Sequence, residues 1–305
     1  MFAYILRRLL WLIPVLLAVA LITFTLMHLV PGGPWERERR LPPQAEENLN
    51  AKYGLDKPVW RQFATYVTDL AQGDLGVSYR QLNRPVLDLI MEKAPVSATL
   101  GAIALVVAVV LGMTLGLLAA LRQNTVIDYA GVSFATFGAS VPSFVFGMLM
   151  LILFSAYLHW LPSSGWGTWQ QAVMPVTALS LLPAAYIARV TRASMLEALQ
   201  QDYIRTARAK GLREQVVVTR HLVRNGLIPV LTVIGPVAAA LVTGSFIIEY
   251  LFSIPGIGRF FVTSISARDY GMIMGTTLFY TTVVVTANLI VDILYAVVDP
   301  RIRYN

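Results

Sequence analysis

Charged residues are absent from five long stretches of the chain, and this pattern restricts the fold more than any other feature. Four of the stretches lie between consecutive charged residues: Arg8 and Glu36, Lys93 and Arg122, Arg224 and Glu249, and Asp269 and Asp292. Each is long enough to cross the apolar part of a bilayer, which takes about 20 helical residues. The fifth runs from Tyr129 to Ala188 and is interrupted by HWLPSSGWGTWQQ at 159–171, whose Pro, Gly, Ser and Trp residues are typical of an interfacial turn. The sequence therefore predicts six spans, near 9–31, 96–121, 130–157, 173–192, 227–250 and 273–297.

The composition agrees with an all-α integral membrane protein. Hydrophobic residues make up 56% of the chain and charged residues only 13%, against about 25% charged residues in a typical soluble protein. The first apolar run could belong to a cleaved signal peptide, because Arg7 and Arg8 precede it and Ala18-Val19-Ala20 resembles a cleavage site. The run continues to Val30, however, which is longer than the apolar part of a signal peptide, so we expect a retained span.

The distribution of basic residues predicts the orientation. With the N-terminus inside, the short cytoplasmic segments carry thirteen basic residues and the short outer loops carry only Arg259 and Arg268. Both termini are therefore expected in the cytoplasm. The net charge of +7 then faces anionic lipid and cytoplasmic partners. A nucleic-acid function is not expected, because no basic soluble domain with interleaved aromatic residues is present.

A mixed-composition segment at 32–95 is predicted to form a small folded cap outside the membrane. Phe63, Val67 and Leu70 follow a helical period there, with Pro and Gly on either side. The expected organisation is the N-terminus and first span in 1–31, the cap in 32–95, and a five-helix core in 96–305 that includes a cytoplasmic loop at 193–226.

Catalytic and cofactor motifs are not found in the sequence. There is no GxxxxGK[ST] loop for ATP, and HExxH, GxSxG and GxGxxG motifs are also missing. The chain has no Cys, and its three His residues are dispersed. We therefore expect no enzymatic activity, no cofactor and no metal site in this chain.

Few charged residues lie where they could act inside the membrane. Asp292 is the main candidate, and we expect a structural pair with Arg189 or Arg192, with proton or sodium coupling as the alternative. Asp128 and Glu249 fall near predicted span ends, where snorkelling or capping accounts for them. Two GxxxG patterns, Gly112–Gly116 and Gly271–Gly275, indicate close helix packing and nothing more specific.

The basic loop at 193–226 is predicted to contain two helices joined at Gly211. Ile204, Ala207 and Leu212 form an apolar stripe, while Arg205 and Arg208 share another face. Gly211 stands where a glycine ends a helix by adopting a positive φ. Beyond it, Val218 and Leu222 are spaced as on one face of a second helix, and Pro229 begins the next span. Two interpretations remain: the basic residues bind anionic lipid at the membrane surface, or the loop docks a partner protein.

Several motifs together resemble the membrane subunits of ATP-binding-cassette importers, whose cytoplasmic loop carries the pattern EAA, three residues and Gly. Here RTA at 205–207 takes the place of EAA, and Pro229 lies farther from Gly211 than in that pattern. Both departures are similar to the peptide-transporter branch, in which RTARAKGL is followed by RH, RN and PVL. Further matches are YILRRLL, LPPQ, AKYGL, GDLGVSY at 73–79, IPGIGRFF at 254–261, RDY at 268–270 and DPRIRY at 299–304. The resemblance covers nearly the whole chain and is strongest to the B-type permease subunits of oligopeptide importers.

The resemblance implies a type I importer permease fold with a coupling helix that docks into an ATPase subunit. This helix maps onto Asp202, Tyr203, Ile204, Arg205, Thr206, Ala207, Arg208, Ala209, Lys210, Gly211 and Leu212. An outer gate loop maps onto Ile254, Pro255, Gly256, Ile257, Gly258 and Arg259.

The resemblance also implies partners and a location. The expected partners are a second, related permease subunit, two ATPase subunits that bind ATP and Mg, a periplasmic or lipid-anchored binding protein, a peptide and the lipid of a bacterial inner membrane. Dipeptide, glutathione or nickel import remains an alternative within the family, and a stand-alone secondary carrier is a more distant one.

Overall fold

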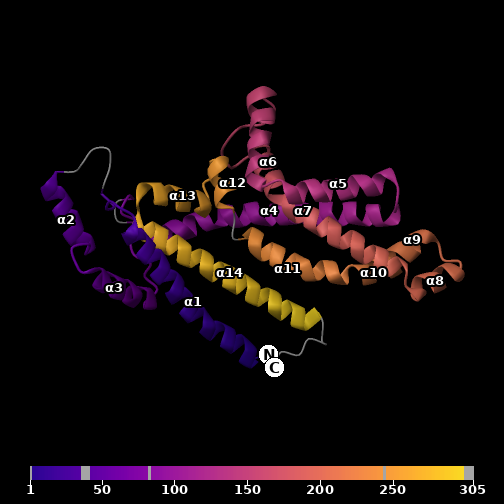
Figure 1. Cartoon of the computed structure of the whole chain (residues 1–305), viewed down its shortest axis with the longest axis horizontal. Coiled ribbons are helices and arrows are strands. Elements are labelled where there is room, and N and C mark those ends of the chain that lie inside the picture. Colours follow the sequence, from indigo (N-terminus) through magenta and orange to yellow (C-terminus); the bar gives the residue numbers. More distant parts are fainter. Residues whose placement is uncertain (1, 36–41, 82–83, 243–244, 299–305) are drawn as a thin grey trace.

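The computed structural model describes residues 2–35, 42–81, 84–242 and 245–298, and the molecule is elongated along one axis (Figure 1). Within these ranges every regular element is a helix, apart from one isolated bridge between Val77 and Pro85. The helices are α1 (Phe2–Leu29), α2 (Pro43–Tyr53), α3 (Val59–Ala71), α4 (Val86–Leu121), α5 (Val126–Ser140), α6 (Ser143–Met150), η1 (Leu151–Tyr157), α7 (Trp169–Leu199), α8 (Asp202–Ala209), α9 (Glu214–Val216), η2 (Val217–Leu222), α10 (Val223–Gly226), α11 (Ile228–Val242), α12 (Phe246–Leu251), α13 (Ile257–Ala267) and α14 (Tyr270–Val298). The DPRIRY motif at 299–304 lies outside the described residues.

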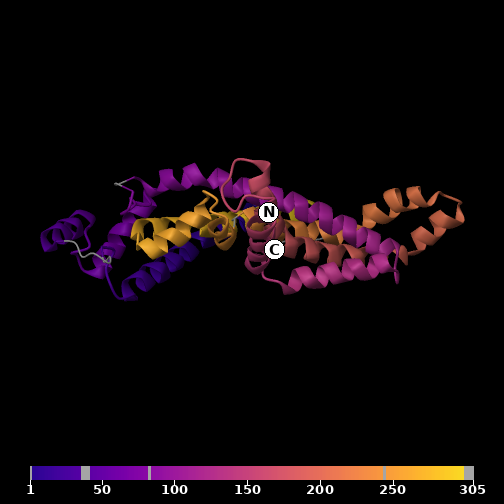
Figure 2. The same cartoon turned by 90° about the horizontal axis from the view of Figure 1, so that it is seen from above.

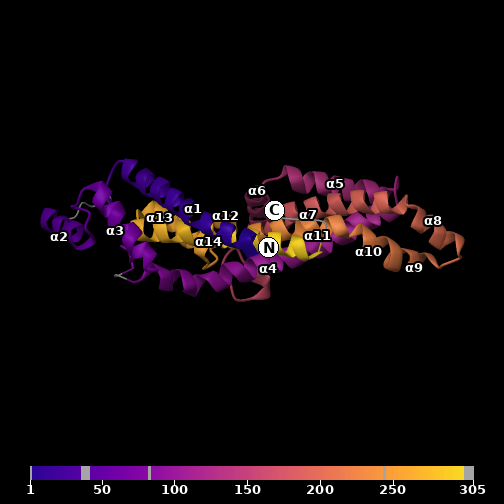
Figure 3. The same cartoon turned by 90° about the horizontal axis from the view of Figure 1, so that it is seen from below.

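The two ends of the long axis carry different elements. Helices α2, α3 and α13 lie at one end, and α8 and α9 lie at the other, as the perpendicular views also show (Figures 1, 2 and 3). Helices α1, α4, α7, α11 and α14 run between the ends. The predicted cap and the predicted cytoplasmic loop therefore lie at opposite ends of the membrane helices, as the orientation derived from the basic residues requires.

Among the described residues, four continuous helices are long and apolar enough to span a membrane, and two bent pairs bring the number to six if each pair forms one span. The boundaries differ from those predicted in two places. Helix α4 begins at Val86 and includes Pro95, so ten residues assigned to the cap belong to the helix that enters the membrane. The predicted span at 227–250 is divided into α11 and the short helix α12.

The predicted span at 130–157 is bent by 102° between α5 and the segment formed by α6 and η1. Val141 has an extended backbone, with φ −98° and ψ 119°, and Pro142 precedes α6. Proline disfavours the helical conformation of the residue before it and lacks the N–H that a continuous helix needs. The second part consequently projects away from the long axis (Figure 1).

The most extensive helix contact is that between α4 and α7. A Cβ atom on Gly112 would lie 2.7 Å from the Ile187 Cβ, and one on Gly116 would lie 2.5 Å from the carbonyl oxygen of Ala188. Both distances are too short, so only glycine permits this approach. The first GxxxG pattern thus does pack two helices. In the second pattern, Gly271 instead lies against the Val77 carbonyl group of the cap.

The intramembrane ion pairs differ from the predicted ones. Asp292 pairs with Arg8 of α1 at 2.6 Å, rather than with Arg189 or Arg192. Arg192 instead pairs with Asp128. Asp128 is only 2% exposed, so it does not snorkel, and its ion pair shows that it does more than cap α5. The reason is the helix arrangement: α14 packs along α1, while α7 packs on α5. Spacing in the sequence does not reveal which helices are neighbours.

One buried carboxylate makes several of the contacts between the cap and the membrane helices. Asp269, at the start of α14, accepts hydrogen bonds from the Ser78 hydroxyl (2.5 Å) and from the backbone N–H groups of Tyr79 (3.0 Å), Arg80 (3.3 Å) and Met272 (3.2 Å). Arg80 donates in return to the carbonyl oxygen of Ala267 at 2.8 Å. The GDLGVSY and RDY motifs, far apart in the sequence, therefore meet at one point.

Replacing Gly116 with alanine should destabilise the protein, because the new methyl group overlaps the α7 backbone. Overpacking of this kind costs about 1–3 kcal/mol. We expect a lower midpoint of thermal unfolding for detergent-solubilised Gly116→Ala. Gly33→Ala is the control, since a Cβ at Gly33 meets nothing within 4 Å. Equal midpoints for the two variants would contradict the assigned packing.

Candidate functional site

The predicted coupling segment forms a short helix beyond the end of α7. Helix α8 follows α7 after an extended residue, Gln201, which turns the chain away from the α7 axis. Ile204 and Ala207 are buried at 0% and 5% exposure and face the protein. They pack in one cluster with residues of α4, α7 and η2, namely Ala120, Met195, Ala198, Val217 and Leu222. Burial of an isoleucine side chain such as that of Ile204 contributes about 1.5–3 kcal/mol, so α8 is held firmly on the membrane helices.

The opposite face of α8 is exposed and mostly charged. Asp202, Arg205, Arg208 and Lys210 are all exposed, and Tyr203 lies beside them at 37% exposure. Leu212, which the sequence predicted to belong to the apolar stripe, is also exposed, at 40%. The buried stripe therefore ends at Ala207. The helix thus offers a basic outer face on an apolar base.

Gly211 ends this helix in the conformation that the sequence predicted. Its φ is +73°, its N–H donates to the Arg208 carbonyl oxygen at 2.9 Å, and the Leu212 N–H donates to the Ala207 carbonyl oxygen at 3.4 Å. These two hydrogen bonds define a Schellman motif, which usually requires glycine at this position. The direction in which the chain leaves α8 is therefore fixed by the backbone.

A side-chain pair closes the turn that Gly211 begins. The Arg208 guanidinium donates to both carboxylate oxygens of Glu214, at 2.7 and 3.2 Å. These hydrogen bonds hold the pKa of the Glu214 carboxyl below its usual range. The role of Glu214 was not predicted from the sequence. A single acidic residue just beyond Gly211 in an otherwise basic loop is the feature that could have indicated this ion pair.

The second helix of the loop contains a π-helical turn, and this shifts its buried face. Val217 and Leu222 are buried at 1% and 0% exposure, whereas Val218 is half-buried. The predicted pair, Val218 and Leu222, assumed a spacing of four, but the wider turn of η2 places residues five apart on one face. Packing on α8 and α7 therefore uses Val217.

Helix α7 is also tied directly to the helix that returns to the membrane. The Ser194 hydroxyl donates to the Gly226 carbonyl oxygen at 2.5 Å. A Cβ at Gly226 would lie 2.6 Å from the Met195 sulfur, so a larger residue there would require the Met195 side chain to move. Helices α7, α8 and α10 thus form one packed unit.

The predicted outer gate loop lies between α12 and α13, apart from α8, and is largely buried. Ile254 and Ile257 are 0% and 2% exposed, Gly256 and Gly258 are buried, and Pro255 and Arg259 are half-buried. The Ile257 N–H donates to the Ser97 hydroxyl of α4 at 2.9 Å. This loop is therefore attached to α4 and does not extend freely into solvent.

Glu249 holds the same loop from α12. Its side chain is 0% exposed, and one carboxylate oxygen accepts the Gly258 N–H at 2.8 Å at the start of α13. A Cβ at Gly258 would lie 3.0 Å from this oxygen and 2.8 Å from the Phe246 Cα, and a Cβ at Gly256 would meet the carboxylate as well. The two glycines of IPGIGR are thus needed for close approach of Glu249, which caps a helix and does not snorkel.

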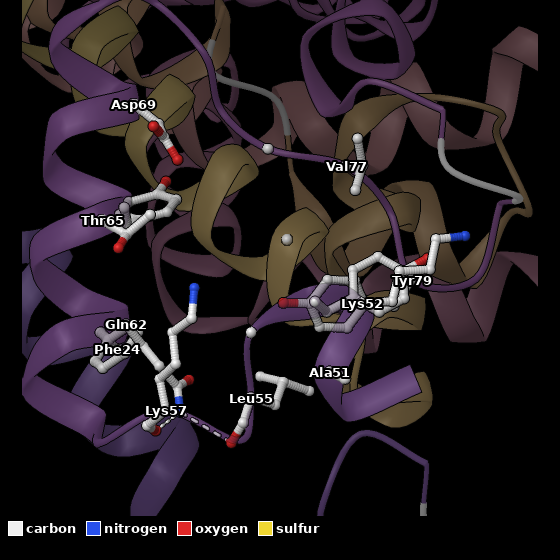
Figure 4. A pocket seen from close by; sticks show the side chains of 15 residues that line it. Phe24, Ala51, Lys52, Leu55, Lys57, Gln62, Thr65, Asp69, Val77 and Tyr79 are labelled. Atoms are coloured by element: carbon white, nitrogen blue, oxygen red, sulfur yellow. Dashed lines mark hydrogen bonds between the residues drawn. The ribbon is translucent and has the colours of Figure 1, made fainter. Parts of the chain in front are cut away.

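A cavity of about 360 Å³ lies between the cap and the membrane helices (Figure 4). Gln62, Thr65 and Asp69 of α3 form one wall, and Val77 and Tyr79 face them from the opposite side. Gln62 donates to the carbonyl oxygens of Leu55 and Lys57, which fixes the turn between α2 and α3. This mixed polar and aromatic cavity faces outward from the spans.

The predicted site residues therefore fall into two separate groups. Residues 202–212 lie together at one end of the molecule, and residues 254–259 lie toward the other end. Asp292 belongs to neither group and forms its pair with Arg8. The hydrogen bond between Ser97 and the loop at 254–259 was not predicted, because a serine within an apolar helix does not reveal which segment it contacts.

Comparison with known families matches nearly the whole chain. Residues 112–304 match the family described as "Binding-protein-dependent transport system inner membrane component". Residues 1–101 match the N-terminal part described as "Binding-prot-dependent transport system membrane comp, N-term".

Individual relatives are similar over their full length. The "Oligopeptide transport system permease protein OppB" of Haemophilus influenzae is 43% identical over 306 residues, covering 100% of both chains. The protein of that name in Escherichia coli strain K12 is 44% identical, also over 100% of both chains. The "Dipeptide transport system permease protein DppB" of Lactococcus lactis is 46% identical over 303 residues, covering 99% of this chain and 100% of the relative.

Solved structures share the fold at lower identity. The inward-facing MetNI methionine ABC transporter gives a TM-score of 0.58 at 18% identity, covering 72% of this chain and 100% of that chain. An amino acid ABC transporter gives 0.54 at 15% identity, covering 68% and 93%. These similarities establish the type I importer permease fold. The chain belongs to the family of inner membrane components of binding-protein-dependent transport systems.

Proposed function

We propose that this protein is a permease subunit that takes up peptides, oligopeptides above all, across a bacterial inner membrane. The observation that carries the proposal is the coupling unit at 202–214, a rigid helix with a basic outer face at the end of α7. Relatives named as oligopeptide permeases and 43–44% identical over their full length support the substrate class. A dipeptide substrate is the second candidate, favoured by the 46% identity to the Lactococcus lactis relative.

The geometry supports a mechanism in which ATPase subunits act on α8. ATP is bound and hydrolysed on separate subunits, and this chain forms the membrane pathway together with a second permease subunit. When the two ATPase subunits close, they displace α8. Because α8 is packed on α4, α7 and η2, the push moves these helices as a unit. The exposed residues Arg205, Arg208 and Lys210 are the ones we assign to the ATPase contact.

The outer end would receive the peptide-loaded binding protein. The cap and the loop at 254–259 lie at this end, and Asp269 makes the cap continuous with α14. We assign the loop at 254–259 to the outer gate, which is tied to α4 through Ser97 and therefore follows the movement of α4.

Uptake of labelled peptides by proteoliposomes containing the complete complex tests the proposal. Transport should require ATP inside, the two ATPase subunits and the binding protein, and peptides of several residues should compete better than dipeptides. Uptake by this chain without ATPase subunits would instead indicate a secondary carrier. Better competition by dipeptides would assign the second candidate.

Replacing Gly211 with valine should uncouple ATP hydrolysis from transport. Valine at a positive φ costs about 1–2 kcal/mol and would disturb the Schellman turn. We expect the Gly211→Val complex to assemble in the membrane but to lose peptide-stimulated ATPase activity and uptake.

Gly73 provides a matched control, because its φ is +82° and a Cβ there also meets nothing within 4 Å. Gly73 lies in the cap, so Gly73→Val introduces similar strain far from the ATPase end. Its ratio of transported peptide to hydrolysed ATP should stay at the wild-type value. Full stimulation of ATPase activity in Gly211→Val would refute the role of the turn.

Trp60 is expected to contact the binding protein. It is 72% exposed at the start of α3, within the cap. Trp60→Ala should raise the binding-protein concentration needed for half-maximal uptake, while ATPase activity without binding protein is unchanged. Trp11→Ala is the control, since Trp11 is 65% exposed but lies on the membrane helix α1. An unchanged concentration dependence for Trp60→Ala would place the docking surface elsewhere.

A further inference from the structure

A groove of about 220 Å³ opens between α4, α5 and α7, near the end that carries α8. Small residues from all three helices form most of its wall, among them Gly116, Gly131 and Ala135. Their lack of long side chains leaves an apolar slot at the surface of the helix bundle. Two arginines of α7, Arg189 and Arg192, line the same groove.

The two arginines have different electrostatic environments. Arg192 donates to both carboxylate oxygens of Asp128, at 2.5 and 2.8 Å, and its charge is neutralised. Arg189 is exposed and donates one long hydrogen bond, 3.5 Å, to the carbonyl oxygen of Ala135. In the parts of the chain that the structure describes, no carboxylate forms an ion pair with Arg189. A cation beside apolar surface in a membrane helix is costly unless an anion accompanies it.

The depth of Arg189 fits the inner leaflet. It precedes the end of α7 at Leu199 by ten residues, or about 15 Å of helix. The exposed basic residues of α8 lie beyond that end and mark the cytoplasmic side. An arginine at this depth reaches the level of lipid phosphate groups with its long side chain.

We propose that this groove binds one anionic phospholipid of the cytoplasmic leaflet. The phosphate accepts hydrogen bonds from the Arg189 guanidinium, whose planar donors match phosphate oxygens. One acyl chain lies in the slot along Gly116, Gly131 and Ala135. Basic pockets between membrane helices on the cytoplasmic side suit anionic headgroups, and this one combines such a cation with an apolar channel of matching shape.

The bound lipid would complete the contact between α5 and α7. Residues of α5 and α7 line the groove, and α7 leads into the proposed coupling helix α8. The site does not depend on which substrate the transporter carries. It therefore goes beyond the proposed function and can be tested without a transport assay.

Native mass spectrometry of the complete transporter, titrated with phosphatidylglycerol or phosphatidylcholine, tests the proposal. The wild-type complex should retain one phosphatidylglycerol per copy of this chain and should bind phosphatidylcholine weakly. Arg189→Gln should weaken phosphatidylglycerol binding about tenfold, as expected for loss of a charge-assisted hydrogen bond. Arg189→Lys should restore part of the affinity.

Two further variants separate the groove from general surface charge. Thr136→Trp keeps Arg189 but fills the slot from an exposed position on α5, and it should also abolish retention of the lipid. Arg220→Gln removes an exposed charge from η2 outside the groove, and its phosphatidylglycerol binding should match the wild type.

Two results would overturn the proposal. One is wild-type phosphatidylglycerol binding by Arg189→Gln, and the other is equal affinity of the wild-type complex for the two lipids.

Discussion

The close contact between α4 and α7 is the constraint on which the rest of the molecule depends. In a bilayer, helices gain little from hiding apolar surface, because the lipid is equally apolar. Association must come from close packing, and Gly112 and Gly116 allow the two backbones to approach without intervening side chains. Helix α4, the longest helix in the described parts of the chain, is thereby joined to α7, which leads into α8.

This contact connects two separate sites. At the first, Ile204 of α8 packs in a cluster with residues of both α4 and α7. At the second, Ser97 of α4 accepts a hydrogen bond from the backbone of the loop at 254–259, and Glu249 of α12 holds the same loop. A displacement of α8 therefore has a continuous route of packed helix and hydrogen bonds to the outer loop. Rigid elements are suited to such transmission because packed interfaces do not deform gradually.

The sequence predicts much of this architecture because its strongest signals are local. Charge-free stretches locate the membrane helices, and a glycine at the end of an amphipathic segment predicts the turn at Gly211. The family resemblance then supplies what a local pattern does not, namely the proposal that residues 202–212 contact an ATPase subunit.

Features that depend on distant contacts were not predictable in the same way. The pairing of Asp292 with Arg8 requires knowing that α1 and α14 are neighbours. The burial of Val217 in place of Val218 depends on a π-helical turn that the residue types do not encode plainly. Ser97 and Glu249 receive their roles only when α4, α12 and α13 come together. The beginning of α4 at Val86 was missed because charged residues in its first turns suggested aqueous cap structure.

The bonds made by Asp269 also set an order of assembly during biosynthesis. Ser78 and Asp269 are 191 residues apart, so the ribosome makes the cap long before its carboxylate partner exists. At about 5–20 residues per second, this interval lasts roughly 10 to 40 s. Until Asp269 has been made, the Tyr79 N–H and the Ser78 hydroxyl lack this carboxylate acceptor. The contact between the cap and α14 is consequently completed only after α8 has already been synthesised.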